Sequence, residues 1–87
     1  MSELNNAKYA FDNAIKLLND NNLKESIEQL EEILKIHPNH KTSLSLLSDI
    51  YIKLNKPNES LKYINEVLKI DKTDKNILEK KYKILLY

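Results

Sequence analysis

Apolar residues recur every three or four positions along most of the chain. Between positions 23 and 36 they fall at Leu23, Ile27, Leu30, Ile33, Leu34 and Ile36. This spacing traces one stripe along an α-helix, with polar residues around the rest of its circumference. Pro38 follows, and the residue before a proline disfavours helical backbone. The pattern therefore predicts an amphipathic helix over residues 23–36.

The same reading predicts five helices in all and an all-α fold. The other four are Ser2–Asn19, Lys41–Leu54, Pro57–Ile70 and a last helix that begins at Lys75. Asn22, followed three residues later by Glu25, has the pattern of a capping box for the second helix. Asp74 is the expected N-cap of the fifth helix, and either Asn39 or His40 that of the third.

An internal repeat is the strongest signal in the chain. Shifted by 34 residues, the sequence overlays itself without a gap, and polar as well as apolar residues match. The identical matches include Asn21 with Asn55, Glu25 with Glu59, Ser26 with Ser60, and Leu34-Lys35-Ile36 with Leu68-Lys69-Ile70. Chance does not easily align identical polar residues at one offset. Each repeat therefore reads as a pair of helices.

Small residues stand where the two helices of each hairpin are expected to cross. They are Ala14 and Ser26 in the first repeat, and Ser48 and Ser60 in the second. A small side chain lets two backbones approach closely, so these positions are predicted to lie at buried crossings. Tyr51 and Tyr63 are expected to pack between helices.

A helix–turn–helix unit of about 34 residues is the period of the tetratricopeptide repeat, and this chain resembles that family. The matching positions are Ala14, Leu17, Ser26, Leu30, Ile33 and Pro38 in the first repeat, and Leu44, Leu47, Ser48, Tyr51, Ser60, Ile64 and Val67 in the second. The resemblance implies a single α-solenoid domain over residues 1–87. Repeat one covers about 7–40, repeat two 41–74, and a C-terminal capping helix 75–87.

In this family the first helix of each hairpin lines a concave groove that binds a peptide or helix of a partner protein. Carried over, the groove positions predict a partner-binding set of Phe11, Asp12, Ile15, Leu46, Asp49, Ile52, Lys53, Lys80 and Lys83. Four of these residues are more apolar than a solvated face requires, which is typical of an interaction surface. A helix register shifted by one position would instead place them in the core.

The resemblance therefore implies a protein–protein interaction module. In the groove, apolar side chains would anchor the partner, and Asp12, Asp49, Lys53 and Lys80 would orient it. One subset of the family clamps the C-terminal carboxylate of chaperones with lysine, asparagine and arginine. Of the equivalent positions here, only Lys80 carries a suitable charge, so we expect no such clamp.

Composition argues against catalysis and bound cofactors. The chain has no cysteine and no glycine, which excludes thiolate metal sites and glycine-rich phosphate loops. Its two histidines, His37 and His40, flank Pro38 with no carboxylate in the same loop, whereas a stable metal site needs three or four ligands. No nucleophile or base stands in a recognisable constellation. We expect no enzyme activity, no metal and no cofactor.

Charge and hydropathy limit the partners further. The basic residues are 14 lysines without arginine, against 13 acidic residues, for a net charge of +1. A nucleic-acid binder normally shows a basic face and a high isoelectric point, so we expect no nucleic acid. No run approaches the ~20 apolar residues that cross a membrane, and no signal peptide pattern is present. A cytoplasmic protein is the expectation.

A structural role is the alternative to partner binding. Leu78, Tyr82 and Leu85 form one apolar stripe on the last helix, while Ile77 and Ile84 are expected to face the fourth helix. An uncovered stripe of this kind predicts a weak homodimer through the C-terminal helix. The chain would then be a self-associating repeat unit, or a fragment of a longer array of repeats.

Overall fold

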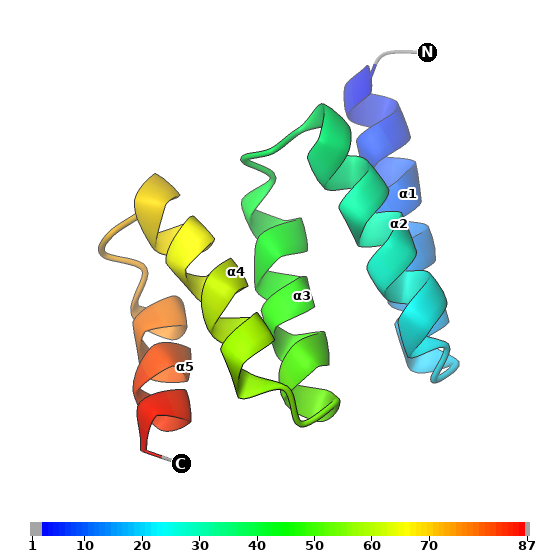
Figure 1. Cartoon of the computed structure of the whole chain (residues 1–87). Coiled ribbons are helices and arrows are strands. Elements are labelled where there is room, and N and C mark those ends of the chain that lie inside the picture. Colours follow the sequence, from blue (N-terminus) through cyan, green and yellow to red (C-terminus); the bar gives the residue numbers. More distant parts are fainter. Residues whose placement is uncertain (1–2, 87) are drawn as a thin grey trace. The chain divides into compact units, whose positions relative to one another are not determined.

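The computed structural model describes residues 3–86, and their side chains from residue 7 onward. The described chain is built from α1 (Glu3–Asn19), α2 (Leu23–Ile36), α3 (Lys41–Lys53), α4 (Pro57–Ile70) and α5 (Lys75–Leu85) (Figure 1). These bounds confirm the five predicted helices to within a residue or two, although Ser2, the predicted start of the first helix, lies outside the described residues.

The chain divides into two compact units, which meet between Ser43 and Leu44 inside α3. In the first unit, α1 packs against α2. The second unit contains the larger part of α3 together with α4 and α5, and α4 packs against α5. Short turns join the helices of each hairpin, so α1 runs antiparallel to α2, and α3 to α4 (Figure 1).

Both hairpins cross at the small residues that the sequence predicts. Ser26 Oγ donates a hydrogen bond to the carbonyl oxygen of Ala14 over 2.8 Å, and Ser60 Oγ donates to the carbonyl oxygen of Ser48 over 2.8 Å. All four residues are buried. A buried hydroxyl is costly unless it is hydrogen-bonded, and here the facing backbone supplies the acceptor. Serine thus fits a crossing that a larger side chain would force apart.

Asparagine occupies the left-handed position at the tip of each hairpin, where glycine is the usual residue. Asn21 and Asn55 adopt left-handed backbone, with φ of 63° and 60°. The N–H of Asn22 bonds to Leu17 O over 2.8 Å, and that of Asn21 to Leu18 O over 3.0 Å. This is the Schellman pattern that ends a helix, and the second hairpin repeats it. Asparagine tolerates this conformation better than other residues with a side chain.

The helix starts agree with the expected caps only in part. Asp74 accepts a hydrogen bond from Ile77 N–H over 3.1 Å at the start of α5, as predicted. At α2, Asn22 stands at the N-cap position but makes no side-chain cap bond, so the predicted capping box is wrong. The reason is the tight turn before it: Asn22 has φ −88° and ψ 68°, outside the extended backbone that aims a capping side chain at the helix.

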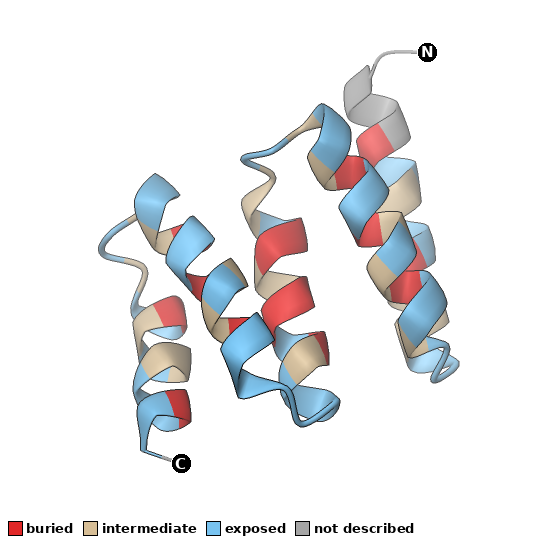
Figure 2. Cartoon of the chain, in the orientation of Figure 1, coloured by how far each residue is buried: buried red, intermediate tan, exposed pale blue. Residues whose placement is uncertain are grey.

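Apolar side chains fill the interior of each unit, along the helix faces coloured red in Figure 2. The buried apolar residues of the first unit are Ala7, Ala14, Leu30 and Ile33. Those of the second unit are Leu44, Leu47, Ile50, Ile64, Val67, Ile77 and Ile84. The burial of Ile77 and Ile84 agrees with the predicted inner face of α5.

Candidate partner-binding site

Four of the nine predicted groove residues line one surface hollow in the second unit. The hollow has a volume of about 270 Å³ and lies among α3, α4 and α5. Its lining consists of Ser48, Asp49, Ile52, Ser60, Ile64, Lys80, Lys83 and Ile84. The predicted residues among them are Asp49 and Ile52 from α3, and Lys80 and Lys83 from α5. We call this hollow the second-repeat hollow.

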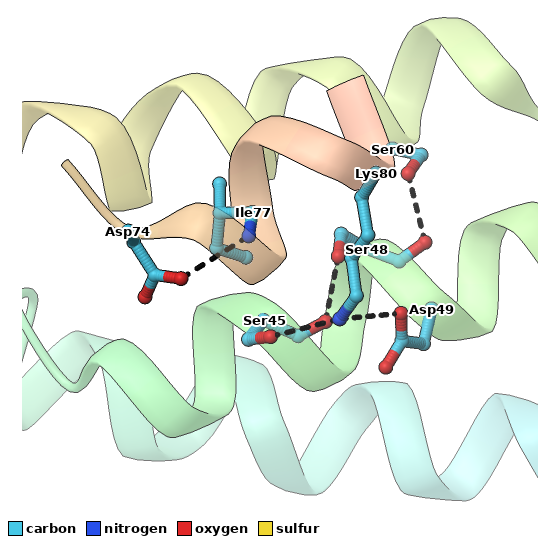
Figure 3. A network of polar contacts seen from close by, with 7 residues as sticks. All are labelled: Ser45, Ser48, Asp49, Ser60, Asp74, Ile77 and Lys80. Carbon is cyan, nitrogen blue, oxygen red and sulfur yellow. Dashed lines mark hydrogen bonds and ion pairs between the residues drawn. The ribbon is translucent and has the colours of Figure 1, made fainter. Parts of the chain in front are cut away.

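The floor of the second-repeat hollow offers no hydroxyl proton to a ligand. Ser60 Oγ donates to the carbonyl oxygen of Ser48, and Ser48 Oγ donates to the carbonyl oxygen of Ser45 over 2.6 Å (Figure 3). The remaining floor residues, Ile64 and Ile84, are buried and apolar. Because the polar atoms already have backbone partners, the floor suits an apolar side chain.

An ion pair closes one side of the hollow. Lys80 Nζ lies 2.9 Å from Asp49 Oδ1 and donates a hydrogen bond to Ser45 Oγ over 3.2 Å, which links α5 to α3 (Figure 3). The Lys80 side chain is 33% exposed and that of Asp49 51% exposed, so water screens the pair. Both residues were predicted as orienting charges for a partner, and in the free protein each is held by the other.

Two further lysines leave this face positively charged. Lys83 lines the hollow and Lys53 lies one turn beyond Asp49 on α3. Both are exposed, and neither forms an ion pair with any residue that the structure describes. Glu79 lies one turn before Lys83, but no ion pair joins those two described side chains. Only one of the three lysines therefore has a carboxylate partner.

The other predicted groove residues lie outside the hollow. Leu46 of α3 is half-buried in the second unit. On α1 of the first unit, Phe11 and Ile15 are half-buried and Asp12 is exposed. No residue of the predicted set belongs to the buried core.

Phe11 contacts the turn that follows α2. Its ring centroid lies 5.7 Å from that of His40, and the ring planes are tilted by 56°. His40 Nδ1 accepts a hydrogen bond from Ser43 N–H over 3.2 Å and lies 2.6 Å from Ser43 Oγ. His40 is thus the N-cap of α3, which the sequence left open between Asn39 and His40. Histidine is uncommon in this role, so composition alone could not decide between them.

Both histidines of this turn, His37 and His40, are half-buried. Desolvation lowers the pKa of His40, and the nearby His37 lowers it further. His37 Nε2 is buried and has no hydrogen-bond partner among the described residues. No group of three or more histidine, cysteine or acidic side chains in residues 7–86 could hold a metal ion. The turn is therefore a structural connection in which the titratable His40 caps α3.

A second hollow, of about 320 Å³, lies on α4 and is lined by Lys62, Tyr63, Asn65 and Glu66. The ring of Tyr63 stacks on that of Tyr51 of α3, with centroids 5.7 Å apart and planes within 6°. This stack confirms that the two tyrosines pack between helices. The hollow beside it contains no residue of the predicted set and is lined by one helix alone.

The helix pairs, the 34-residue period and the small crossing residues define a helical-hairpin repeat protein. A family model of the tetratricopeptide repeat matches residues 17–81, which is well over half of the chain. The chain therefore belongs to the tetratricopeptide repeat family. No curated protein gives a significant match to the sequence. Within the described residues, none of the helices has the length and apolar character to span a membrane.

Proposed function

We propose that this chain is a protein-binding module whose first-helix faces receive a peptide or helix of a partner protein. Membership of the tetratricopeptide repeat family supports the general class, since its domains are generally protein–protein interaction modules. One observation carries the finer statement. Asp49, Ile52, Lys80 and Lys83 line one hollow with an apolar floor and a charged rim, which supports the proposal.

In this proposal, apolar contacts supply affinity and charges supply orientation. A partner side chain enters the second-repeat hollow against Ile52 and the buried floor. The α1 residues Phe11 and Ile15 form a second apolar contact surface on the first unit, with Asp12 exposed beside them. These two surfaces lie on different units, and each is tested by its own variant.

A peptide-display selection on the intact protein, followed by variants, tests the proposal. Ile15→Glu and Leu46→Glu should abolish capture of the selected peptides while circular dichroism shows unchanged helix content. Ile36→Glu is the matched control, because Ile36 is 62% exposed and outside the predicted set. Because Leu46 is half-buried, Ile52→Glu provides a second variant at a more exposed position. Undiminished capture by all three groove variants would overturn the proposal.

Self-association is the second candidate function, and the outer face of α5 favours it. Tyr82 and Leu85 are 60% and 62% exposed, and Leu78 beside them is half-buried. Pairing of two copies would bury this stripe at roughly 1.5–3 kcal/mol for each fully covered side chain. Sedimentation equilibrium of the parent beside Tyr82→Lys/Leu85→Lys tests it. A parent that stays monomeric at high concentration excludes this candidate.

A further inference from the structure

The second-repeat hollow differs in chemistry between its floor and its rim, and this difference defines a class of occupant. We propose that it binds an acidic segment of a partner protein that carries one large apolar side chain. The inference rests on the proposed function and deepens it, because it states what the partner must look like at this face. Three observations carry it: the size of the hollow, the saturated floor and the unbalanced lysines.

Size limits what enters. A volume of about 270 Å³ lies just below the range of roughly 300–1,000 Å³ that is typical of pockets for whole small molecules. The hollow is open on its outer side, where Ile52 is 41% exposed. One side chain of a partner fits such a space better than an entire cofactor does.

The floor selects an apolar group. The hydroxyl groups of Ser48 and Ser60 both donate to backbone carbonyl oxygens, so a polar ligand finds no hydroxyl donor there. Ile64, Ile84 and Ile52 provide the remaining contact surface. A leucine, isoleucine, phenylalanine or methionine side chain loses little hydration on entry, whereas an amide or hydroxyl would lose hydrogen bonds with water.

The rim selects negative charge. Lys83 at the hollow and Lys53 one turn beyond Asp49 have no carboxylate partner among the described residues, while Lys80 is paired with Asp49. The face therefore carries excess positive charge although the chain as a whole is nearly neutral, with a net charge of +1. Aspartate or glutamate on either side of the partner's apolar side chain would form ion pairs with these two lysines.

A single-stranded nucleic acid is the less favoured occupant of the same face. Such ligands are held by aromatic platforms on which bases stack, and by arginine as well as lysine. The lining of this hollow contains no aromatic residue, and the chain has no arginine. The two adjacent features that do occur, an apolar floor and lysines around it, fit a polypeptide.

Synthetic peptides in which net charge and apolar anchor vary independently test the proposal. Each peptide is amidated and acetylated, so that no terminal charge takes part. One series places a single leucine among aspartate and serine, a second replaces that leucine with asparagine, and a third replaces aspartate with lysine. Fluorescence anisotropy with the full chain should show that the first series binds with an affinity about tenfold or more higher than that of either other series.

Two charge variants with opposite expected signs sharpen the test. Lys83→Gln should weaken binding of the acidic leucine peptide by about two- to fivefold, because an exposed charge pair is lost. Asp49→Asn should strengthen it, because Lys80 is released towards the ligand. A merely structural effect would weaken binding in both. Lys72→Gln, in the turn after α4, is the control and should leave affinity unchanged.

A matched pair tests the apolar anchor. Ile52 and Ile70 lie in the same unit with nearly equal exposed fractions, 41% and 42%, but only Ile52 lines the hollow. Ile52→Asn should reduce affinity for the acidic leucine peptide about fivefold or more, and Ile70→Asn should not change it. Equal losses in the two variants would overturn the assignment of the anchor to this hollow.

Failure of this inference differs from failure of the proposed function. If peptides selected by display bind at the first-helix faces but show no preference for acidic residues, the inference is wrong and the protein-binding function stands. Preferential binding of the lysine series would contradict the inference in the same way. If the groove variants leave every selected peptide bound, both are wrong.

Discussion

Chemically different side chains cap the helices at equivalent positions of the two repeats. At the start of α3, the imidazole of His40 accepts a hydrogen bond from Ser43 N–H over 3.2 Å. Thirty-four residues later, the carboxylate of Asp74 accepts one from Ile77 N–H over 3.1 Å. The period of the repeat therefore fixes where a cap is needed, and leaves open which acceptor provides it.

Other features are the same in both hairpins. The serine hydroxyl bonds at the crossings have equal lengths, the asparagines at the tips share left-handed backbone, and a Glu–Lys ion pair of three-residue spacing recurs near the end of α2 and of α4. These features depend on residues inside one hairpin. The turns between hairpins, by contrast, differ in sequence and in chemistry.

The predicted groove positions also change character from one repeat to the next. Asp49 and Lys80, which form an ion pair in the second unit, correspond after a shift of 34 residues to Ile15 and Leu46. Equivalent positions are thus apolar at one step of the repeat and charged at the next. A repeat scaffold can vary these positions freely, because none of them is in the buried core.

Overpacking the crossings should have the largest effect on stability. Ser26→Leu and Ser60→Leu each insert a bulky side chain at a residue with no exposed surface, and each removes a buried hydrogen bond. We expect a loss of about 1–3 kcal/mol or more in the free energy of unfolding for either variant. Urea denaturation followed by circular dichroism measures it.

Alanine variants separate volume from hydrogen bonding at the same positions. Ser26→Ala and Ser60→Ala remove only the hydroxyl and should cost about 1 kcal/mol each. An unchanged unfolding midpoint for Ser60→Leu would contradict the buried crossing at Ser60. A large difference between Ser26→Leu and Ser60→Leu would contradict the equivalence of the two crossings.

The caps should differ in their response to pH. His40→Ala and Asp74→Ala are each expected to cost about 1 kcal/mol at neutral pH. Only the His40 cap depends on a neutral imidazole, because protonation turns Nδ1 from an acceptor into a donor. Burial already lowers the pKa of His40, so the folded state favours the neutral ring.

The sign of this effect follows from proton binding. As pH falls below about 6.5, the unfolded chain binds a proton at this histidine before the folded chain does, so stability is lost in that range. His40→Asn keeps a capping side chain without titrating and should reduce the slope of stability between pH 7 and 5. His37→Gln is the matched control variant at the neighbouring position. A slope unchanged in His40→Asn would refute the role of its ring.

The sequence predicted the parts of this molecule that depend on local spacing. Helix bounds, the crossing serines and the Asp74 cap follow from periodicity, side-chain size and the presence of a short acceptor before a helix. The missing side-chain bond of Asn22 did not follow, because the tight turn before it fixes its backbone outside the capping range. The Lys80–Asp49 pair also did not follow, because its partners meet through the packing of α5 beside α3.

The asparagines at the hairpin tips offer a third test of repeat equivalence. Asn21→Ala and Asn55→Ala place a residue that disfavours left-handed backbone at φ near 60°, and each should cost roughly 0.5–1 kcal/mol. Asn21→Gly and Asn55→Gly should be neutral or slightly stabilising, since glycine adopts this conformation readily. Thermal unfolding of the four variants gives the comparison. An alanine variant as stable as the glycine variant would contradict it.

Breaking the ion pair at the hollow should have the smallest effect on stability. The pair is partly exposed, so Asp49→Asn should change the free energy of unfolding by about 0.5 kcal/mol at low salt and by less at high salt. The same variant is expected to strengthen binding of an acidic peptide. A large loss of stability would mean that the pair holds α5 in place, and that the charge is not available to a partner.

The most direct measurement is an NMR titration of the isotope-labelled chain with the amidated acidic leucine peptide, following backbone amide shifts. We predict that the largest shifts occur at the second-repeat hollow, around Ile52, Lys83 and Ile84. Shifts centred instead on Lys62 and Tyr63 of α4 would place binding on another face and contradict the assignment to this hollow.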